Sequence, residues 1–138
     1  MEIRTFEERD EPAVTALWRA VFPDAPARSD PAEIIRRKLA VQRELFFVAV
    51  LDGEVVGTAL GGYDGHRGWV YHVAVSPAHR RRGVGAALLR RVEEALRQSG
   101  CPKLNLQILA SNSGVVPFYE RLGYRVEERI SMGKPLLP

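Results

Sequence analysis

Apolar residues recur at helical spacing near the start of the chain. They fall at i, i+3, i+4, i+7 and i+8, which is the pattern of one buried helix face. The residues on this face are Val14, Leu17, Trp18, Val21 and Phe22. Asp10 precedes them as a candidate N-cap, and Pro12 suits a first helical turn. We therefore expect a helix that begins near Asp10 and packs on a core.

Two further elements flank this helix. Residues Ile3 to Phe6 are typical of a short strand, and Pro23 to Asp30 is a loop with several prolines nearby. The pair Asp30-Pro31 predicts the start of a second helix, whose apolar side chains recur as Ile34, Ile35 and Leu39. The two helices and their loop should form one unit.

The middle of the chain changes to a strand pattern. Residues Leu45 to Leu51 predict a strand, Asp52-Gly53 a tight hairpin turn, and Val55 to Tyr63 the antiparallel partner. A second turn at Asp64 to Gly68 leads to a further strand at Trp69 to Val75. These three strands should form an antiparallel meander.

The next segment predicts a strand, helix, strand crossover. Ser76-Pro77 ends the preceding strand, and after Gly85 the apolar residues return to helical spacing until Gly100. Lys103 to Ile108 then alternates as a strand does. A crossover of this length makes its two strands parallel, with a right-handed connection. The predicted fold class is α/β, with an α+β mixed sheet that joins an antiparallel meander to one parallel crossover.

The last part of the chain predicts one short helix. Ser113 is a plausible cap for a helix at Val115 to Leu122, and Gly123 ends it. Tyr124 to Met132 should return as extended chain. With 138 residues and 46% hydrophobic content, the sequence suits a single domain over residues 1–138.

Composition excludes several classes of protein. No apolar run approaches a membrane span, and the acidic start does not resemble a signal peptide, so we expect a cytoplasmic protein without membrane association. The single Cys101 cannot form an internal disulfide. The three histidines lack partners at ligand spacing, so we expect no metal.

The net charge of +3 is small, but three arginines stand together in mid-chain, followed by two glycines. The segment reads Arg80-Arg81-Arg82-Gly83-Val84-Gly85. Cations at a helix start oppose its dipole, and an anion bound there would remove the conflict. Free N–H groups beside residues without bulky side chains form an anion-binding cradle. The alternative is a solvated basic face that binds nothing.

Other phosphate motifs do not fit. There is no Gly-Lys-Ser/Thr, and Leu88 stands where a dinucleotide fingerprint requires its third glycine. The pattern Arg80-x-x-Gly83-x-Gly85 after an apolar strand resembles the acetyl-CoA signature of the GNAT N-acetyltransferase superfamily. A second signature follows, with Asn112 and, seven residues later, Tyr119 before the helix end Leu122-Gly123-Tyr124. The chain also resembles small bacterial acetyltransferases of the YpeA type at Gly61 to Gly68, Cys101-Pro102-Lys103 and Tyr119 to Tyr124.

The resemblance implies the GNAT acyl-CoA N-acyltransferase fold and transfer of an acetyl group from acetyl-CoA to a primary amine of a small amine, amino acid, peptide or protein. Transfer would occur by direct attack in a ternary complex. The cosubstrate would be held by the strand, the basic loop and the second signature. The implied binding residues are Val73, Ala74, Val75, Arg80, Arg81, Arg82, Gly83, Val84, Gly85, Ala86, Asn112, Tyr119 and Arg121.

The candidate catalytic residues are Tyr119, His72 and Tyr71. A neutral phenol at Tyr119 could protonate the departing thiolate. Relatives place Glu or His at positions that match Trp69 or Tyr71, and neither residue is a competent base here. In a regular strand His72 would point to the opposite face, which leaves an ordered water or solvent as the base.

Other functions stay open at this point. A CoA-binding sensor domain would keep the basic loop and lack a base. A nucleic-acid module would use the arginines on phosphodiesters, but the strands are apolar and no aromatic or basic residues alternate along them, so no nucleic-acid partner is expected. Glu33 and Asp64 are acidic alternatives for the base without positional support. The amine acceptor and the oligomeric state, a homodimer included, are not determined by the sequence.

Overall fold

The computed structural model describes residues 1–137, which form two compact units. The first runs from Met1 to Leu106 and the second begins at Gln107. Each is described by itself.

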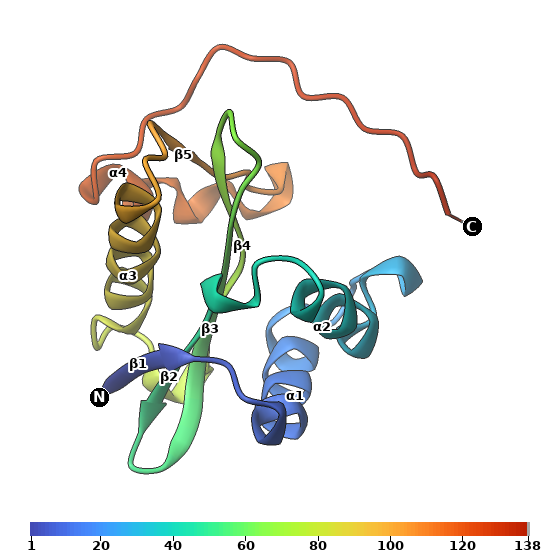
Figure 1. Cartoon of the computed structure of the whole chain (residues 1–138), viewed down its shortest axis with the longest axis vertical. Coiled ribbons are helices and arrows are strands. Elements are labelled where there is room, and N and C mark those ends of the chain that lie inside the picture. The colour runs from blue at the N-terminus through green and yellow to red at the C-terminus, as the bar shows by residue number, and fades with distance from the viewer. Residues whose placement is uncertain (138) are drawn as a thin grey trace. The chain divides into compact units, whose positions relative to one another are not determined.

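A five-stranded sheet forms the centre of the first unit, in the order β1-β2-β3-β4-β5 (Figure 1). Its first four strands pair antiparallel, and β4 pairs parallel with β5. The strands are β1 (Glu2–Thr5), β2 (Phe46–Leu51), β3 (Glu54–Tyr63), β4 (Gly68–Val75) and β5 (Leu104–Asn105). The predicted mixed sheet, with a meander and one parallel crossover, is confirmed.

Three helices cover the two faces of this sheet. Helices α1 (Glu11–Val21) and α2 (Pro31–Leu39) lie on one side, and α3 (Val84–Gln98) lies on the other (Figure 1). One core forms between α1 and the sheet and contains Trp18, Phe46 and Leu60. Side chains of α3 fill the opposite face, where Leu88, Leu89 and Val92 are fully buried. The helices predicted for these three segments from the sequence are confirmed.

Two glycines of β3 let α3 approach the sheet closely. A Cβ atom at Gly57 would lie 2.9 Å from a methyl group of Val84 and 3.0 Å from one of Leu88. At Gly61 it would lie 3.0 Å from a methyl group of Val92. Larger residues at these positions would push α3 away from the sheet.

The hairpin turn between β2 and β3 has the predicted chemistry. Asp52 and Gly53 both adopt positive φ, at 50° and 79°. Tight two-residue hairpins favour this left-handed pair, and Asp-Gly adopts it at low cost.

Asp10 occupies the predicted N-cap position of α1, but the capping role expected of its side chain is wrong. The Asp10 side chain makes no capping hydrogen bond to α1. It instead receives two hydrogen bonds from the Arg4 guanidinium, at 2.8 and 2.9 Å, and one from the backbone N–H of Glu7 at 2.8 Å. The Arg4 hydrogen bonds hold the pKa of the Asp10 carboxyl below its usual value. This pair fastens β1 to the turn before α1.

The predicted strand at Lys103 to Ile108 is much shorter than expected. Only Leu104 and Asn105 pair with β4, opposite Gly68 and Trp69. Alternation along the sequence requires a neighbouring strand at every step to become a ladder, and here the pairing stops after two residues.

The second unit contains the 3-10 helix η5 (Ala110–Val115) and the short helix α4 (Val116–Arg121). The predicted cap at Ser113 is wrong, because α4 begins after Val115 and no side chain caps it. Gly123 ends the helix with φ 98°, as predicted. Residues 124–137 carry no helix or strand.

Within residues 1–137, no helix has the length and apolarity needed to cross a membrane.

Candidate active site

The basic loop links the end of β4 to the start of α3. After Val75 the chain makes a 3-10 turn at Pro77–His79 and then passes through two left-handed residues, Arg81 at φ 64° and Gly83 at φ 77°. Glycine adopts this conformation without steric cost, and α3 begins at the next residue. The predicted glycine-rich helix start is therefore present.

The N–H groups at this helix start are free within the described chain. The first helical bond runs from Ala87 N–H to the Gly83 carbonyl, at 3.0 Å. No atom of residues 1–137 accepts from the N–H groups of Val84, Gly85 or Ala86. Free donors and the positive end of a 15-residue helix dipole favour an anion at this point. The side chains of residues 80–82 are exposed around it.

The edge of β4 that leads to this loop is open within the first unit. Because β5 pairs only with Gly68 and Trp69, the segment from Val70 to Val75 has no strand beside it among residues 1–106 on that edge. Free backbone groups on a strand edge can pair with an extended ligand that carries amides. The predicted backbone site at Val73, Ala74 and Val75 lies on this segment.

Strand β4 is bulged at His72, which corrects the regular strand assumed from the sequence. Thr58 pairs with Ala74 and Leu60 pairs with Tyr71, so His72 and Val73 together oppose Ala59. His72 also has a positive φ of 49°. A bulge re-aims the side chain that it carries. The imidazole of His72 therefore faces α1, on the same side of the sheet as the Tyr71 side chain.

A buried hydrogen-bond chain holds this bulge in place. The indole N–H of Trp18 donates to Thr58 Oγ1 at 2.8 Å, and this hydroxyl donates to the His72 carbonyl at 2.9 Å. Thr58 is completely buried. Left-handed backbone at a non-glycine residue costs about 1–3 kcal/mol and persists only where its surroundings enforce it. The bulge is thus fixed from α1 and β3.

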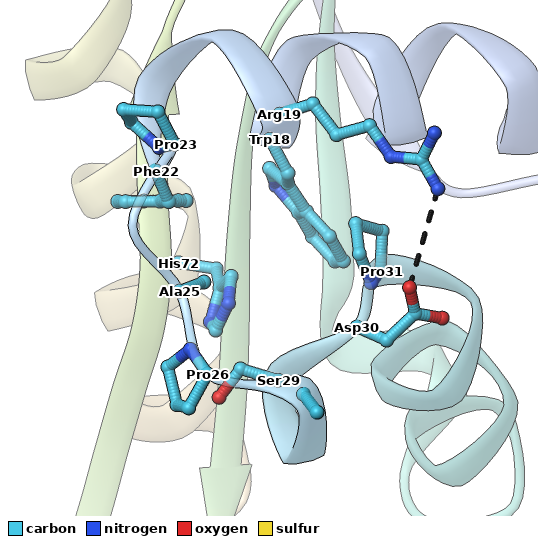
Figure 2. A pocket seen from close by; sticks show the side chains of 11 residues that line it. Trp18, Arg19, Phe22, Pro23, Ala25, Pro26, Ser29, Asp30, Pro31 and His72 are labelled. Carbon is cyan, nitrogen blue, oxygen red and sulfur yellow. Dashed lines mark ion pairs between the residues drawn. The ribbon is translucent and has the colours of Figure 1, made fainter.

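His72 lines a cavity of about 380 Å³ between α1, the following loop and α2, here called the His72 cavity. Figure 2 shows the imidazole near Trp18 and Phe22, beside the loop that carries Pro23 and Pro26. Its ring centre lies 4.7 Å from that of Trp18 and 5.1 Å from that of Phe22. Arg19 and Asp30 lie at the rim, with 4.0 Å between a guanidinium nitrogen of Arg19 and Oδ1 of Asp30. Burial lowers the pKa of His72, so the imidazole is neutral at neutral pH.

The second unit carries the remaining candidates. Tyr119 lies in α4 and is half-buried against Phe118 and Tyr124, with ring centres 5.0 and 5.9 Å away. Burial raises the pKa of its phenol, which keeps the proton on at neutral pH. Asn112 lies in η5 and Arg121 ends α4, and both are exposed.

Tyr71 projects from β4 beside the bulge and is 52% exposed. Burial of the rest of the ring raises the pKa of its phenol, and the charge of Asp64 adds to this effect. A phenol that stays protonated in this way donates hydrogen bonds and does not act as a base.

Comparison with known proteins decides the family. Residues 11–124 match the model of the Acetyltransferase (GNAT) family, a span that covers part of each unit. A protein named acetyltransferase from Yersinia pestis (strain Pestoides F) is 43% identical over 137 residues, which cover 99% of this chain and 96% of the relative. The chain belongs to the GNAT acetyltransferase family. This membership confirms the resemblance and the enzyme class predicted from the sequence.

Solved structures confirm the fold. The apo structure of an aminoglycoside antibiotic 6'-N-acetyltransferase from Acinetobacter haemolyticus superimposes with a TM-score of 0.81 at 19% identity, with 100% of each chain covered. Another aminoglycoside N-acetyltransferase, solved in complex with CoA, gives a TM-score of 0.78 at 20% identity and covers 99% of this chain and 95% of its own.

Sequence reasoning missed two residues of this site. Trp18 and Thr58 were read only as parts of a helix face and a strand, yet their hydrogen bond supports the bulge. The one available signal was a polar Thr in an otherwise apolar strand, because a buried hydroxyl requires a partner.

Proposed function

We propose that this GNAT protein transfers the acetyl group of acetyl-CoA to a primary amine by direct attack in a ternary complex. The observation that carries the proposal is the open edge of β4, which runs from Val70 to Val75 directly into the free N–H groups at the start of α3. An extended chain with amides fits the first, and a pyrophosphate fits the second. CoA contains both.

The chemistry forms one bond and breaks another. The amine nitrogen, in its neutral form, attacks the thioester carbonyl carbon, and the oxyanion is stabilised by a backbone N–H near Val73. The carbon–sulfur bond then breaks, and the amide and a free thiol result. The nitrogen loses one proton and the thiolate sulfur gains one, so the site must accept a proton on one side and supply a proton on the other.

Tyr119 is the proposed acid. Its raised pKa keeps the phenol protonated, so a proton is available to the departing thiolate, although the transfer is uphill because a thiol is the stronger acid. Asn112 and Arg121 are the proposed partners for an amide of the pantetheine arm and for a phosphate. Arg80, Arg81 and Arg82 would supply the positive field around the same phosphates.

His72 is the proposed proton acceptor, in place of the solvent base expected from a regular strand. The bulge turns the imidazole into a cavity lined by Trp18 and Phe22, and burial keeps it neutral. A neutral imidazole can accept a proton from the attacking amine. Tyr71, its neighbour in β4, would orient the acceptor as a hydrogen-bond donor.

A covalent route through Cys101 is disfavoured. Its Sγ donates to the Lys103 carbonyl at 3.4 Å, and it lies beside Gly68, where β4 begins. The basic loop follows the other end of β4, after Val75. A thiol at the far end of the strand cannot receive the acetyl group from a CoA bound along this edge.

A turnover assay tests the proposal. Purified protein, acetyl-CoA and a panel of amines are mixed, and free thiol is followed with time. We expect amine-dependent thiol release together with a rise in melting temperature, since a ligand at one hundred times its Kd adds about 2.7 kcal/mol. Stabilisation by CoA without turnover of any amine would favour a sensor domain. The absence of both stabilisation and turnover would reject the proposal.

A further inference from the structure

A second cavity, of about 500 Å³, lies beside the C-terminal end of α2. Lys38 and Gln42 form one wall, Trp69 and Tyr71 project from β4, and Asp64 stands at the turn between β3 and β4. We call it the Lys38 cavity. Its lining continues along β4 from the His72 cavity, because Tyr71 and His72 are neighbours in the chain.

Lys38 is a half-buried cation without an acidic partner in the described chain. Its ammonium donates to the Gly61 carbonyl at 2.6 Å, which uses one of three N–H donors. No salt bridge within residues 1–137 includes it. Burial lowers its pKa, and the charge of Glu44 only partly opposes this effect. A desolvated ammonium with two free donors favours an anion beside it.

Several other polar groups of this cavity are already used or can donate. Asp64 Oδ1 accepts two backbone N–H groups of its own turn, at 2.8 Å each. Gln42 is fixed at both ends by the backbone of Tyr63. The indole N–H of Trp69 and the hydroxyl of Tyr71 bond to nothing within residues 1–137, and their rings stack at 6.4 Å. The groups left for a ligand are therefore the Lys38 ammonium, the donors of Trp69 and Tyr71, and the second carboxylate oxygen of Asp64 at the turn.

The sheet register gives the spacing between the two cavities. Gly61, which receives the Lys38 hydrogen bond, pairs with Val70, two residues before His72. At a rise of about 3.3 Å per residue, the backbone positions of Val70 and His72 lie at most roughly 7 Å apart along β4. The aromatic rings of Trp69 and Tyr71 lie on this stretch.

We propose that Lys38 binds a carboxylate of the acceptor, and that the acceptor is an ω-amino acid. The amine would lie at His72, the carboxylate at Lys38, and the methylene chain on the aromatic rings between them. This inference rests on the acetyl transfer proposed above.

The test uses a matched pair of acceptors, 6-aminohexanoate and 6-aminohexanamide, which differ only in the charged group. In the wild-type protein we expect kcat/KM for the acid to exceed that for the amide by about 10- to 100-fold, the usual effect of one charge-assisted hydrogen bond. In Lys38→Met the ratio should fall to about one, through KM and not kcat. Lys134→Met, which removes an exposed cation of the second unit, should keep the wild-type ratio.

Two measurements separate this inference from the proposed function. CoA affinity is measured by calorimetry for each protein, and 6-aminohexanoate and its amide are then titrated into the CoA-loaded protein. Absent CoA binding would reject acetyl transfer itself. Intact CoA binding with equal affinity for acid and amide would overturn the Lys38 subsite alone.

A folding defect in Lys38→Met would appear as lost CoA affinity. In that case Trp69→Phe, which keeps an aromatic ring but removes the indole N–H donor, should lower the preference for the acid about three- to tenfold. An unchanged preference in whichever variant retains CoA affinity would also overturn the subsite.

Discussion

Thr58→Val should loosen the bulge that aims His72 and destabilise the protein strongly. Valine has nearly the shape of threonine, so no cavity forms, but the hydroxyl disappears. The indole N–H of Trp18 loses its 2.8 Å acceptor and the His72 carbonyl loses its 2.9 Å donor, both in the interior. An unsatisfied buried group costs about 1–3 kcal/mol, so the two together should cost about 2–6 kcal/mol. This is a large share of a typical stability of about 5–15 kcal/mol.

Urea unfolding at pH 7, followed by tryptophan fluorescence, measures this loss. Thr58→Ser retains the hydroxyl and should lose only about 1 kcal/mol, for the deleted methyl group. Thr5→Val, at an exposed position of β1, should change the free energy of unfolding by less than about 0.5 kcal/mol. In Trp18→Phe the donor is already gone, so adding Thr58→Val should cost less than it does in the wild type.

The same variants report on function. Thr58→Val should lower kcat/KM for the amine, whereas Thr58→Ser should keep most of the wild-type kcat/KM. The reason is that serine retains the hydroxyl that holds the His72 carbonyl in the bulge. Equal free energies of unfolding for Thr58→Val and Thr58→Ser, or normal activity in Thr58→Val, would refute the role assigned to this hydrogen-bond chain.

Three further outcomes are expected. Burial lowers the pKa of His72, so as the pH falls the imidazole is protonated in the unfolded chain before it is protonated in the folded protein. The stability due to neutral His72 is therefore full above about pH 6.5 and is lost as the pH falls toward the pKa of His72 in the folded protein. Between pH 7.5 and 5.5 the urea midpoint should fall less in His72→Gln than in the wild type, and equal falls would contradict this. Tyr119→Phe keeps the ring but removes the acid, so kcat should drop on the order of 10²- to 10⁴-fold at unchanged CoA affinity, provided that chemistry limits the rate; a near-normal kcat would remove Tyr119 from the reaction. Gly85→Asp should abolish CoA binding in a folded protein, because an acidic residue in the first turn suits the helix dipole but repels pyrophosphate; calorimetry showing retained affinity would argue against the anion site. Gly83 is less suitable for this test, since its φ of 77° strains any side chain.

The sequence predicted the elements whose cause is local. Helical spacing of apolar residues defined α1 and α3, and Asp52-Gly53 defined the hairpin, because each signal lies within the element that it shapes. The glycine-rich start of α3 was also readable, since the left-handed conformation at Gly83 belongs to the residue itself.

The features missed are those imposed from a distance. Nothing within Trp69 to Val75 predicts a bulge, because the hydrogen bonds that enforce it come from Trp18 and Thr58, on α1 and β3. The strand at Lys103 to Ile108 alternates correctly, but only two of its residues have a partner on β4. Register and pairing are properties of the assembled sheet, so they could not be read from either segment alone.

Acetyl-CoA titration of the ¹⁵N-labelled protein tests the central claim most directly. If the cosubstrate lies along β4 and ends at α3, the backbone amides of residues 73–75 and 84–86 should shift together, with one saturating 1:1 isotherm that persists at moderate salt. Shifts confined to the arginines at positions 80–82, weak and abolished by salt, would indicate only a solvated basic patch and would contradict the account.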